Sequence, residues 1–233
     1  MLSAFSLNTA LPGEKAVATM YNQWKGKWYQ NFVFEQKAIF YNNGKVVRTD
    51  VWQEVLSSPG NLHIRFNGFE TNNGVIYVND SVYTFQSGVL KTKKRETNFL
   101  ALLGFDIYFN EPQITAMKLS EMGYDLRKIY NIRFRNSDVM VVGTDNPADT
   151  SSSQFWIDTK NQWVIRAIKN NAGAVRDVHF NDYRQIDNHW VATEMVFKNP
   201  VDTVFVERYF NMKFPEHIPA EVFDPVKFKD ARW

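Results

Sequence analysis

The segment 98–109 constrains the fold most, because it is apolar on nearly every side of a helix. Such a helix must be covered by other parts of the chain on most of its surface. Segments typical of β-strands flank it, over 28–91 and 128–214. A helix that lies across one face of a curved antiparallel sheet satisfies both requirements. The sequence therefore predicts an α+β fold.

The segment 28–40 changes the hydrophobic period to two, with mostly apolar residues at even positions. This alternation is typical of a strand with one buried face. Asn43-Gly44 follows and lies between two strand-like runs, which is a strong hairpin signal. Further turn signals at 57–60, 79–80 and 87–88 divide the remainder into an antiparallel meander.

The rest of the chain completes a single domain over 1–233. Apolar residues at spacings of three and four predict an opening helix over 13–25. The segment 97–123 is predicted to hold two helices: one over 98–109, capped by Thr97 or Asn98, and a second over 114–122. A second meander covers 128–214, with a turn at 136–138, and a tail covers 215–233.

Charge and composition exclude several classes of function. Lys and Arg number 27 against 25 Asp and Glu, which argues against a nucleic-acid partner. The basic cluster Lys91, Lys93, Lys94 and Arg95 is interpreted as a solvated turn ahead of a helix, or as a contact for lipid headgroups or a partner protein. The absence of cysteine excludes thiolate catalysis and Cys-based metal sites. The first residues lack a signal peptide, which fits either a cytosolic protein or an exported protein whose leader was removed.

Signatures of catalysis are missing. The four histidines have no partner at metal-binding spacing, and neither a nucleophile elbow nor a phosphate loop is present. A pair of carboxylates across the sheet remains open, because hydrolases of that type carry no local motif. We therefore expect a protein that is not an enzyme and holds neither a metal nor a cofactor.

Apolar residues, by contrast, are abundant: 44% are hydrophobic and 15% aromatic. A sheet that curls around helices, with Phe and Trp lining the gap, would form an apolar cleft able to hold a lipid chain. The alternative is that the same side chains close-pack into a dry core.

An ordered set of short motifs resembles the outer-membrane lipoprotein-sorting proteins, the LolA/LolB-type carriers, and in particular their exported relatives. The motifs follow one another over nearly the whole chain: 26–29, 59–65, 75–77, 82–85, 98–109, 155–158, 163–166, 180–183, 190–193 and 218–225. The resemblance implies an incomplete, half-open antiparallel β-barrel, in which helices cover the concave face of one large sheet and acyl chains bind between them.

On this basis the protein is expected to be a periplasmic, monomeric carrier of a lipid or of lipoprotein acyl chains, with an envelope protein or a membrane surface as a further partner. The residues expected to line the apolar cavity are Trp28, Phe32, Phe34, Ile64, Phe66, Phe99, Leu100, Leu103 and Ile107. Replacing Leu100 and Leu103 by Asp should then abolish loading with the fold intact. The alternative is an envelope interaction or sensing domain that has the same fold and a packed interior.

One position departs from the family pattern. The best-known carriers have a basic residue just before the Pro of a Pro-Asn/Gly turn, where it helps to fasten the lid. Here that position is Ser58, ahead of Pro59. The departure argues against the same fastening of the helical lid (97–123) and against the same cargo. The chain also has no lipobox cysteine, which implies a soluble periplasmic form unless an anchor was trimmed away.

Overall fold

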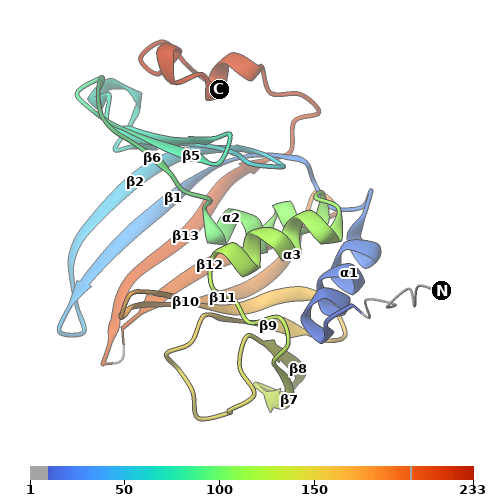
Figure 1. The fold of residues 1–233 in the computed structure, drawn as a ribbon. Helices are drawn as coiled ribbons and strands as arrows, with labels where there is room; N and C mark the ends of the chain where they lie inside the picture. The colour runs from blue at the N-terminus through green and yellow to red at the C-terminus, as the bar shows by residue number, and fades with distance from the viewer. Residues whose placement is uncertain (1–9, 200) are drawn as a thin grey trace.

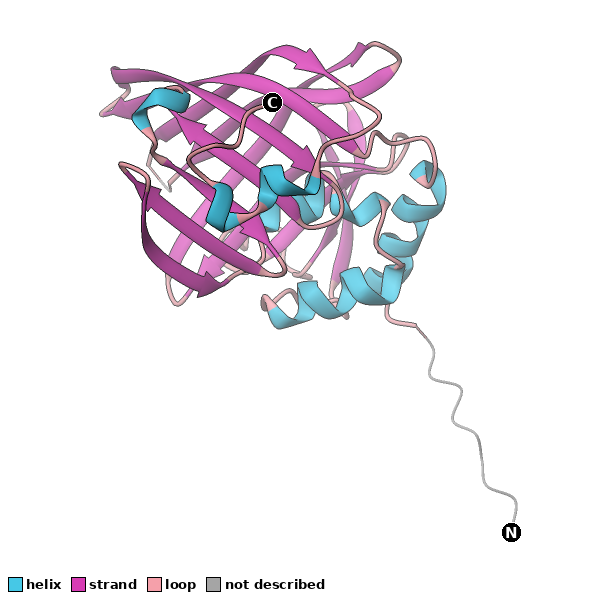
Figure 2. Ribbon diagram, turned by 90° about the horizontal axis from the view of Figure 1, so that it is seen from above, coloured by secondary structure: helices cyan, strands magenta, loops and turns pink. Residues whose placement is uncertain are grey.

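The computed structural model describes residues 10–199 and 201–233. The start of the chain, on which the expectation about a signal peptide rests, lies outside them. Thirteen antiparallel strands form one sheet in the order β6-β5-β4-β3-β2-β1-β13-β12-β11-β10-β9-β8-β7. The two meanders meet where β1 (Asn31–Asn42) pairs with β13 (Thr203–Lys213). Because β6 (Val89–Arg95) and β7 (Ile129–Phe134) remain edges, the curved sheet is a half-open barrel (Figures 1 and 2).

The N-terminal meander continues through β2 to β5, and the C-terminal one through β8 to β12. Their bounds are β2 (Lys45–Ser57), β3 (Asn61–Phe66), β4 (Gly74–Val78), β5 (Ser81–Gln86), β8 (Ser137–Val142), β9 (Gln154–Asp158), β10 (Trp163–Asn171), β11 (Ala174–Ile186) and β12 (His189–Lys198).

Two-residue turns join many of these strands. Asn43 and Gly44 have φ values of 49° and 71°, as a hairpin turn of the primed type requires, so the predicted turn is confirmed. Asn79-Asp80 and Ser87-Gly88 are confirmed in the same way. The turn predicted at 136–138 lies one residue earlier, at Arg135-Asn136.

Helices cover part of the concave face (Figure 1). We call α1 (Pro12–Trp24), α2 (Phe99–Gly104), the 3-10 turn η2 (Asp106–Tyr108) and α3 (Pro112–Glu121) the helical cover. The side-chain oxygen of Asn98 accepts hydrogen bonds from the N–H groups of Leu100 and Ala101, at 3.0 and 3.2 Å, and so caps α2. The expectation of one helix over 98–109 is wrong, because Phe105 has a non-helical backbone (φ −139°, ψ −62°) that separates α2 from η2.

Two other local predictions need correction. The cluster Lys91–Arg95 is not a turn but the exposed end of edge strand β6, which pairs with β5 through the Ser87-Gly88 hairpin. Lysines are common on edge strands because they oppose pairing with another sheet. Trp28 precedes β1 instead of opening it, since its N–H bonds the carbonyl of Trp24 and prolongs the turn after α1.

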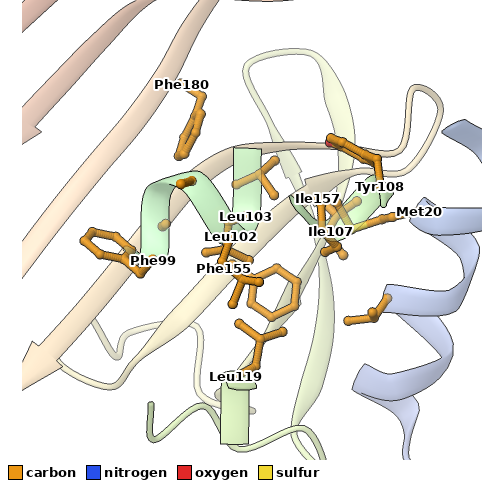
Figure 3. Close-up of a cluster of buried hydrophobic side chains, with 14 of the residues drawn as sticks. Met20, Phe99, Leu102, Leu103, Ile107, Tyr108, Leu119, Phe155, Ile157 and Phe180 are labelled. Atoms are coloured by element: carbon orange, nitrogen blue, oxygen red, sulfur yellow. The ribbon is translucent and has the colours of Figure 1, made fainter. Parts of the chain in front are cut away.

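The main core lies between the helical cover and the sheet (Figure 3). Leu102 and Leu103 of α2, Leu119 of α3 and Phe155 of β9 are all fully buried there. The tail after β13 carries the 3-10 turns η3 (Ala220–Phe223) and η4 (Pro225–Lys227) and packs on the opposite, convex face of β3 to β5. A third short turn, η1 (Phe69–Thr71), joins β3 to β4.

Candidate functional site

Most of the residues predicted to line a cavity meet in the main core. Trp28, Phe32, Phe34, Phe99, Leu103 and Ile107 are buried members of it, and Ile64 and Leu100 pack against it with part of their surface exposed. Phe66 lies elsewhere, beside Trp52.

These residues are packed against one another in the structure. Phe32, Leu103 and Ile107 are 0% exposed. The ring centroids of Phe32 and Phe34 lie 4.3 Å apart, and those of Trp28 and Tyr108 lie 4.2 Å apart. A chain could enter this region only if the helical cover moved away from the sheet, because a close-packed interior has no room for it.

A second group of apolar side chains lies on the concave face beyond the helical cover. We call it the aromatic strip, and its members are Phe40, Trp52, Phe66, Phe197 and Phe205. The centroids of Trp52 and Phe66 lie 4.6 Å apart, those of Phe40 and Phe205 4.8 Å, and those of Phe197 and Phe205 5.1 Å. All five side chains are partly exposed. In Figure 1 the long strands β1, β2, β12 and β13 run on past the helices.

Strand register explains why these rings gather. Phe40 of β1 pairs with Phe205 of β13, which pairs with Phe197 of β12, while Trp52 of β2 pairs with Phe66 of β3. Paired residues of neighbouring strands point to the same side of a sheet. Only Phe66 among them was expected at the site from the sequence, because Phe40, Phe205 and Phe197 come together through the pairing of distant strands.

Four polar side chains lie on the same face between the aromatic strip and the main core. We call Gln36, Glu54, Glu207 and Tyr209 the polar cluster. Gln36 pairs with Tyr209, Ala38 with Glu207 and Phe34 with Glu54. The hydroxyl of Tyr209 donates to Oε2 of Glu207 at 3.2 Å.

Burial dominates the electrostatics of the polar cluster. Burial raises the pKa of Glu207 to about 7, against smaller opposing effects of Gln36 and Tyr209. Burial, and next the charge of Glu207, raise the pKa of Glu54 well above its usual value. Two neighbouring carboxyls in such a setting cannot both ionise easily near neutral pH. Glu54 and Glu207 thus form a pair of interacting carboxyls on the concave face.

The helical cover is fastened to the sheet by polar contacts at its edge. The carboxyl of Asp106 in η2 lies beside the hydroxyl of Ser58 and the N–H of Gly60, in the turn between β2 and β3. Lys118 of α3 forms an ion pair with Asp80, in the turn between β4 and β5. Ser58 thus lies beside the carboxyl of η2, but its buried hydroxyl makes no hydrogen bond of normal geometry with any described residue, and it carries no charge.

Asp106→Asn is expected to stabilise the protein at neutral pH. Burial raises the pKa of Asp106 from 3.8 to about 6, although Gly60 and Ser58 lower it. Between about pH 4 and about pH 6 the carboxyl ionises in the unfolded chain but stays protonated in the folded protein. The free energy of unfolding is therefore highest below about pH 4 and is lower by about 2–3 kcal/mol above about pH 6. Asparagine stays neutral and avoids this loss. Urea unfolding of the wild-type and Asp106→Asn proteins from acid to neutral pH measures this difference in stability. Asp230→Asn is the control, because Asp230 is exposed. A less stable Asp106→Asn protein at neutral pH would contradict this account.

An open surface pocket of about 510 Å³ lies between β6, α3 and the β10–β11 hairpin. Phe99 and Met122 contribute apolar surface to it. Its charged residues have both signs: Arg95, Lys118, Lys169, Arg176, Glu96 and Glu121. This pocket is therefore a polar hollow of the surface next to α2 and not an apolar cavity.

Among residues 10–199 and 201–233, no group of His, Cys, Asp and Glu side chains is arranged to hold a metal ion. In the same part of the chain, no helix is both long enough and apolar enough to cross a membrane.

His63 is fully buried and its Nδ1 lies 2.7 Å from the carbonyl oxygen of Val222 in the tail.

Comparison with solved structures identifies the fold. A DUF1329 family protein from Desulfovibrio piger is 13% identical and has a TM-score of 0.58, and the match covers 92% of this chain and 98% of that one. A LolA superfamily protein from Nitrosomonas europaea is 12% identical, with a TM-score of 0.60 and the same coverage. A domain named for outer membrane lipoprotein sorting, from Vibrio parahaemolyticus, is 13% identical, with a TM-score of 0.59, and the match covers 93% and 98%.

No protein-family model matches the sequence, and no curated protein matches it either. The structural matches nevertheless cover both meanders and the helices between them. The protein thus has the LolA-type fold of the lipoprotein-sorting proteins, as the ordered motifs predicted.

Proposed function

We propose that the protein is a non-enzymatic periplasmic carrier, which binds a lipid or the acyl chains of a lipoprotein on the concave face of its sheet. The observation that carries the proposal is the aromatic strip. Its five rings are partly exposed on a face that the helical cover leaves open. A gathered apolar surface of this kind is typical of a binding site. The LolA-type fold supports the same function by analogy.

The packed core beside the aromatic strip determines how a long chain would bind. A chain that lies on the strip reaches Phe34 and Tyr209, whose ring centroids lie 4.5 Å apart at the edge of the main core. To go deeper it must displace α2 and η2 from the sheet. The ties of Asp106 to the β2–β3 turn and of Lys118 to Asp80 would have to loosen for this movement. Each methylene buried contributes about 0.8 kcal/mol, which is the source of the affinity.

Native mass spectrometry of the protein from a bacterial envelope tests the proposal, followed by solvent extraction of what is bound. We expect a stoichiometric adduct of acyl-chain mass. A fluorescent fatty acid or phospholipid should also bind to the purified protein. A clean mass without uptake of either probe would overturn the proposal.

Phe205→Ser and Val204→Ser form a matched pair for the same question. Phe205 belongs to the aromatic strip, whereas Val204, the preceding residue of β13, is 37% exposed, lies at the bulge between the Phe197–Phe205 and Lys198–Thr203 pairs, and is not part of the strip. Loss of a Phe contact is worth about 1.5–3 kcal/mol, so Phe205→Ser should weaken chain binding about tenfold or more. Val204→Ser should leave the affinity unchanged. Equal effects of the two changes would place the chain elsewhere.

Two observations favour other functions. The fully buried Leu103 and Ile107 fit an envelope interaction domain with a packed interior, which could use the exposed edge strand β6 for a partner. The carboxyls of Glu54 and Glu207 fit a hydrolase that uses a general acid and a general base. Absence of chain uptake would favour the interaction domain. Turnover of a chromogenic ester or glycoside would establish the hydrolase if Glu54→Gln and Glu207→Gln each abolished it.

A further inference from the structure

The polar cluster is unusual on a face that is otherwise apolar. Gln36 is 0% exposed and lies close enough to Glu207 to lower the pKa of that carboxyl, yet neither its Oε1 nor its Nε2 makes a hydrogen bond of normal geometry with any described residue. An amide buried in this state costs free energy, about 1–3 kcal/mol for each group left unsatisfied. A folded protein tolerates such a cost where the group has a role, for example where a ligand supplies the missing partner.

The register of the strands places acceptors on both sides of Gln36. Glu54 on β2 and Glu207 on β13 are its diagonal neighbours, because their direct partners on β1 are Phe34 and Ala38. Diagonal neighbours on one face lie within reach of long side chains. The carbonyl oxygen of Gln36 and the two carboxyls thus provide three acceptors within one small area.

In the part of the chain that the structure describes, the charge of the two carboxyls has no counterion. Among residues 10–199 and 201–233, no Lys, Arg or His forms an ion pair with Glu54 or Glu207. Burial raises the pKa of both carboxyls, and the charge of Glu207 raises that of Glu54 further, which favours a state in which the pair shares one proton. The pair then carries about one negative charge, which one monovalent cation would balance.

The aromatic strip beside the polar cluster is also suited to a cation. Aromatic faces attract ammonium and guanidinium groups, most strongly where water is excluded. Within the protein itself, the guanidinium of Arg48 lies 3.8 Å from the centroid of Phe40, at the outer end of the strip. Arg48 pairs with Asp50 at 3.2 Å and so leaves the inner end, near Glu54 and Glu207, without a cation.

We propose that the concave face binds an amphiphile that carries a primary ammonium group, which Glu54, Glu207 and Gln36 hold while the chain lies against the aromatic strip. A primary ammonium has three N–H donors and no acceptor, which matches the three acceptors of the polar cluster. This inference rests on the proposed function, since it names the class of ligand that the carrier would bind.

Isothermal titration with decylamine, decanoate and 1-decanol tests the inference, because these probes share one chain length and differ in their polar end. Near neutral pH, decylamine should bind at least about tenfold more tightly than 1-decanol, and decanoate more weakly than both. Glu54→Gln and Glu207→Gln should each remove the preference for the amine while 1-decanol still binds. Gln36→Met removes the third acceptor without altering charge and should reduce the preference partly.

Glu35→Gln is the matched control. Glu35 neighbours Gln36 on β1 but points to the other face, where its Oε1 accepts a hydrogen bond from Asn211 at 2.8 Å, and a glutamine oxygen can still accept that bond. The preference for decylamine should be unchanged in this variant. Equal binding of all three probes by the wild-type protein would overturn the amine inference and leave the carrier function standing. Binding of none of them would overturn both.

Discussion

Leu103→Asp is expected to unfold the protein, whereas Leu100→Asp is expected to leave it folded. Both residues lie on α2, but Leu103 is 0% exposed inside the main core and Leu100 is partly exposed at its margin. Truncation of a buried leucine alone costs about 2–5 kcal/mol. A carboxylate without water or a partner costs several kcal/mol more. Together these approach the whole stability of a typical domain, about 5–15 kcal/mol.

Thermal unfolding and amide NMR spectra of the two single variants measure the difference. A cooperative transition and dispersed spectra are expected for Leu100→Asp and not for Leu103→Asp. The result also decides how the resting protein is built. If Leu103→Asp folds normally and only loses chain binding, the helical cover stands away from the sheet in solution, and Leu103 lines an open cavity as the sequence predicted.

Local signals made much of the fold predictable. Asn43-Gly44 and Asn79-Asp80 favour positive φ by their own chemistry, so the hairpins can be located without knowledge of the rest of the chain. The apolar face of α1, which buries Val17 and Met20, is equally local. The half-open arrangement of sheet and helices came from the ordered motifs, and the 13-stranded sheet confirms it.

The site was harder to predict because its residues come from strands far apart in the chain. Phe40 and Phe205 meet only because β1 pairs with β13, and Glu54 and Glu207 share a face for the same reason. Alternation shows that a side chain lies on one face of a strand, but not which distant strand supplies its neighbour. A hydrophobic pattern also does not distinguish an apolar residue that lines a cavity from one that is packed in the core. Ile107 was therefore expected in a cavity, although the structure buries it fully.

The tail was predicted only as a segment after the last strand, yet it completes the convex side of the N-terminal meander. Phe228 is 1% exposed and lies between two groups: the ring of Phe85, with centroids 3.9 Å apart and planes 6° apart, and the guanidinium of Arg65, 3.9 Å from the Phe228 centroid. Arg65 is itself 0% exposed, and its Nη2 donates to the carbonyl of Lys229 at 3.3 Å. The tail therefore shields a buried charge as well as apolar surface.

Phe228→Ala is expected to lower the free energy of unfolding by about 3–5 kcal/mol, since it removes a buried ring and leaves a cavity beside Arg65. Val226→Ala is the matched control, because Val226 lies two residues away in the tail and is 92% exposed, so its replacement should change stability by less than about 0.5 kcal/mol. Urea unfolding measures both. Hydrogen exchange should speed up first in β3 to β5, where the tail packs. A Phe228→Ala protein as stable as Val226→Ala would mean that the tail leaves the sheet in solution and that Arg65 is solvated there.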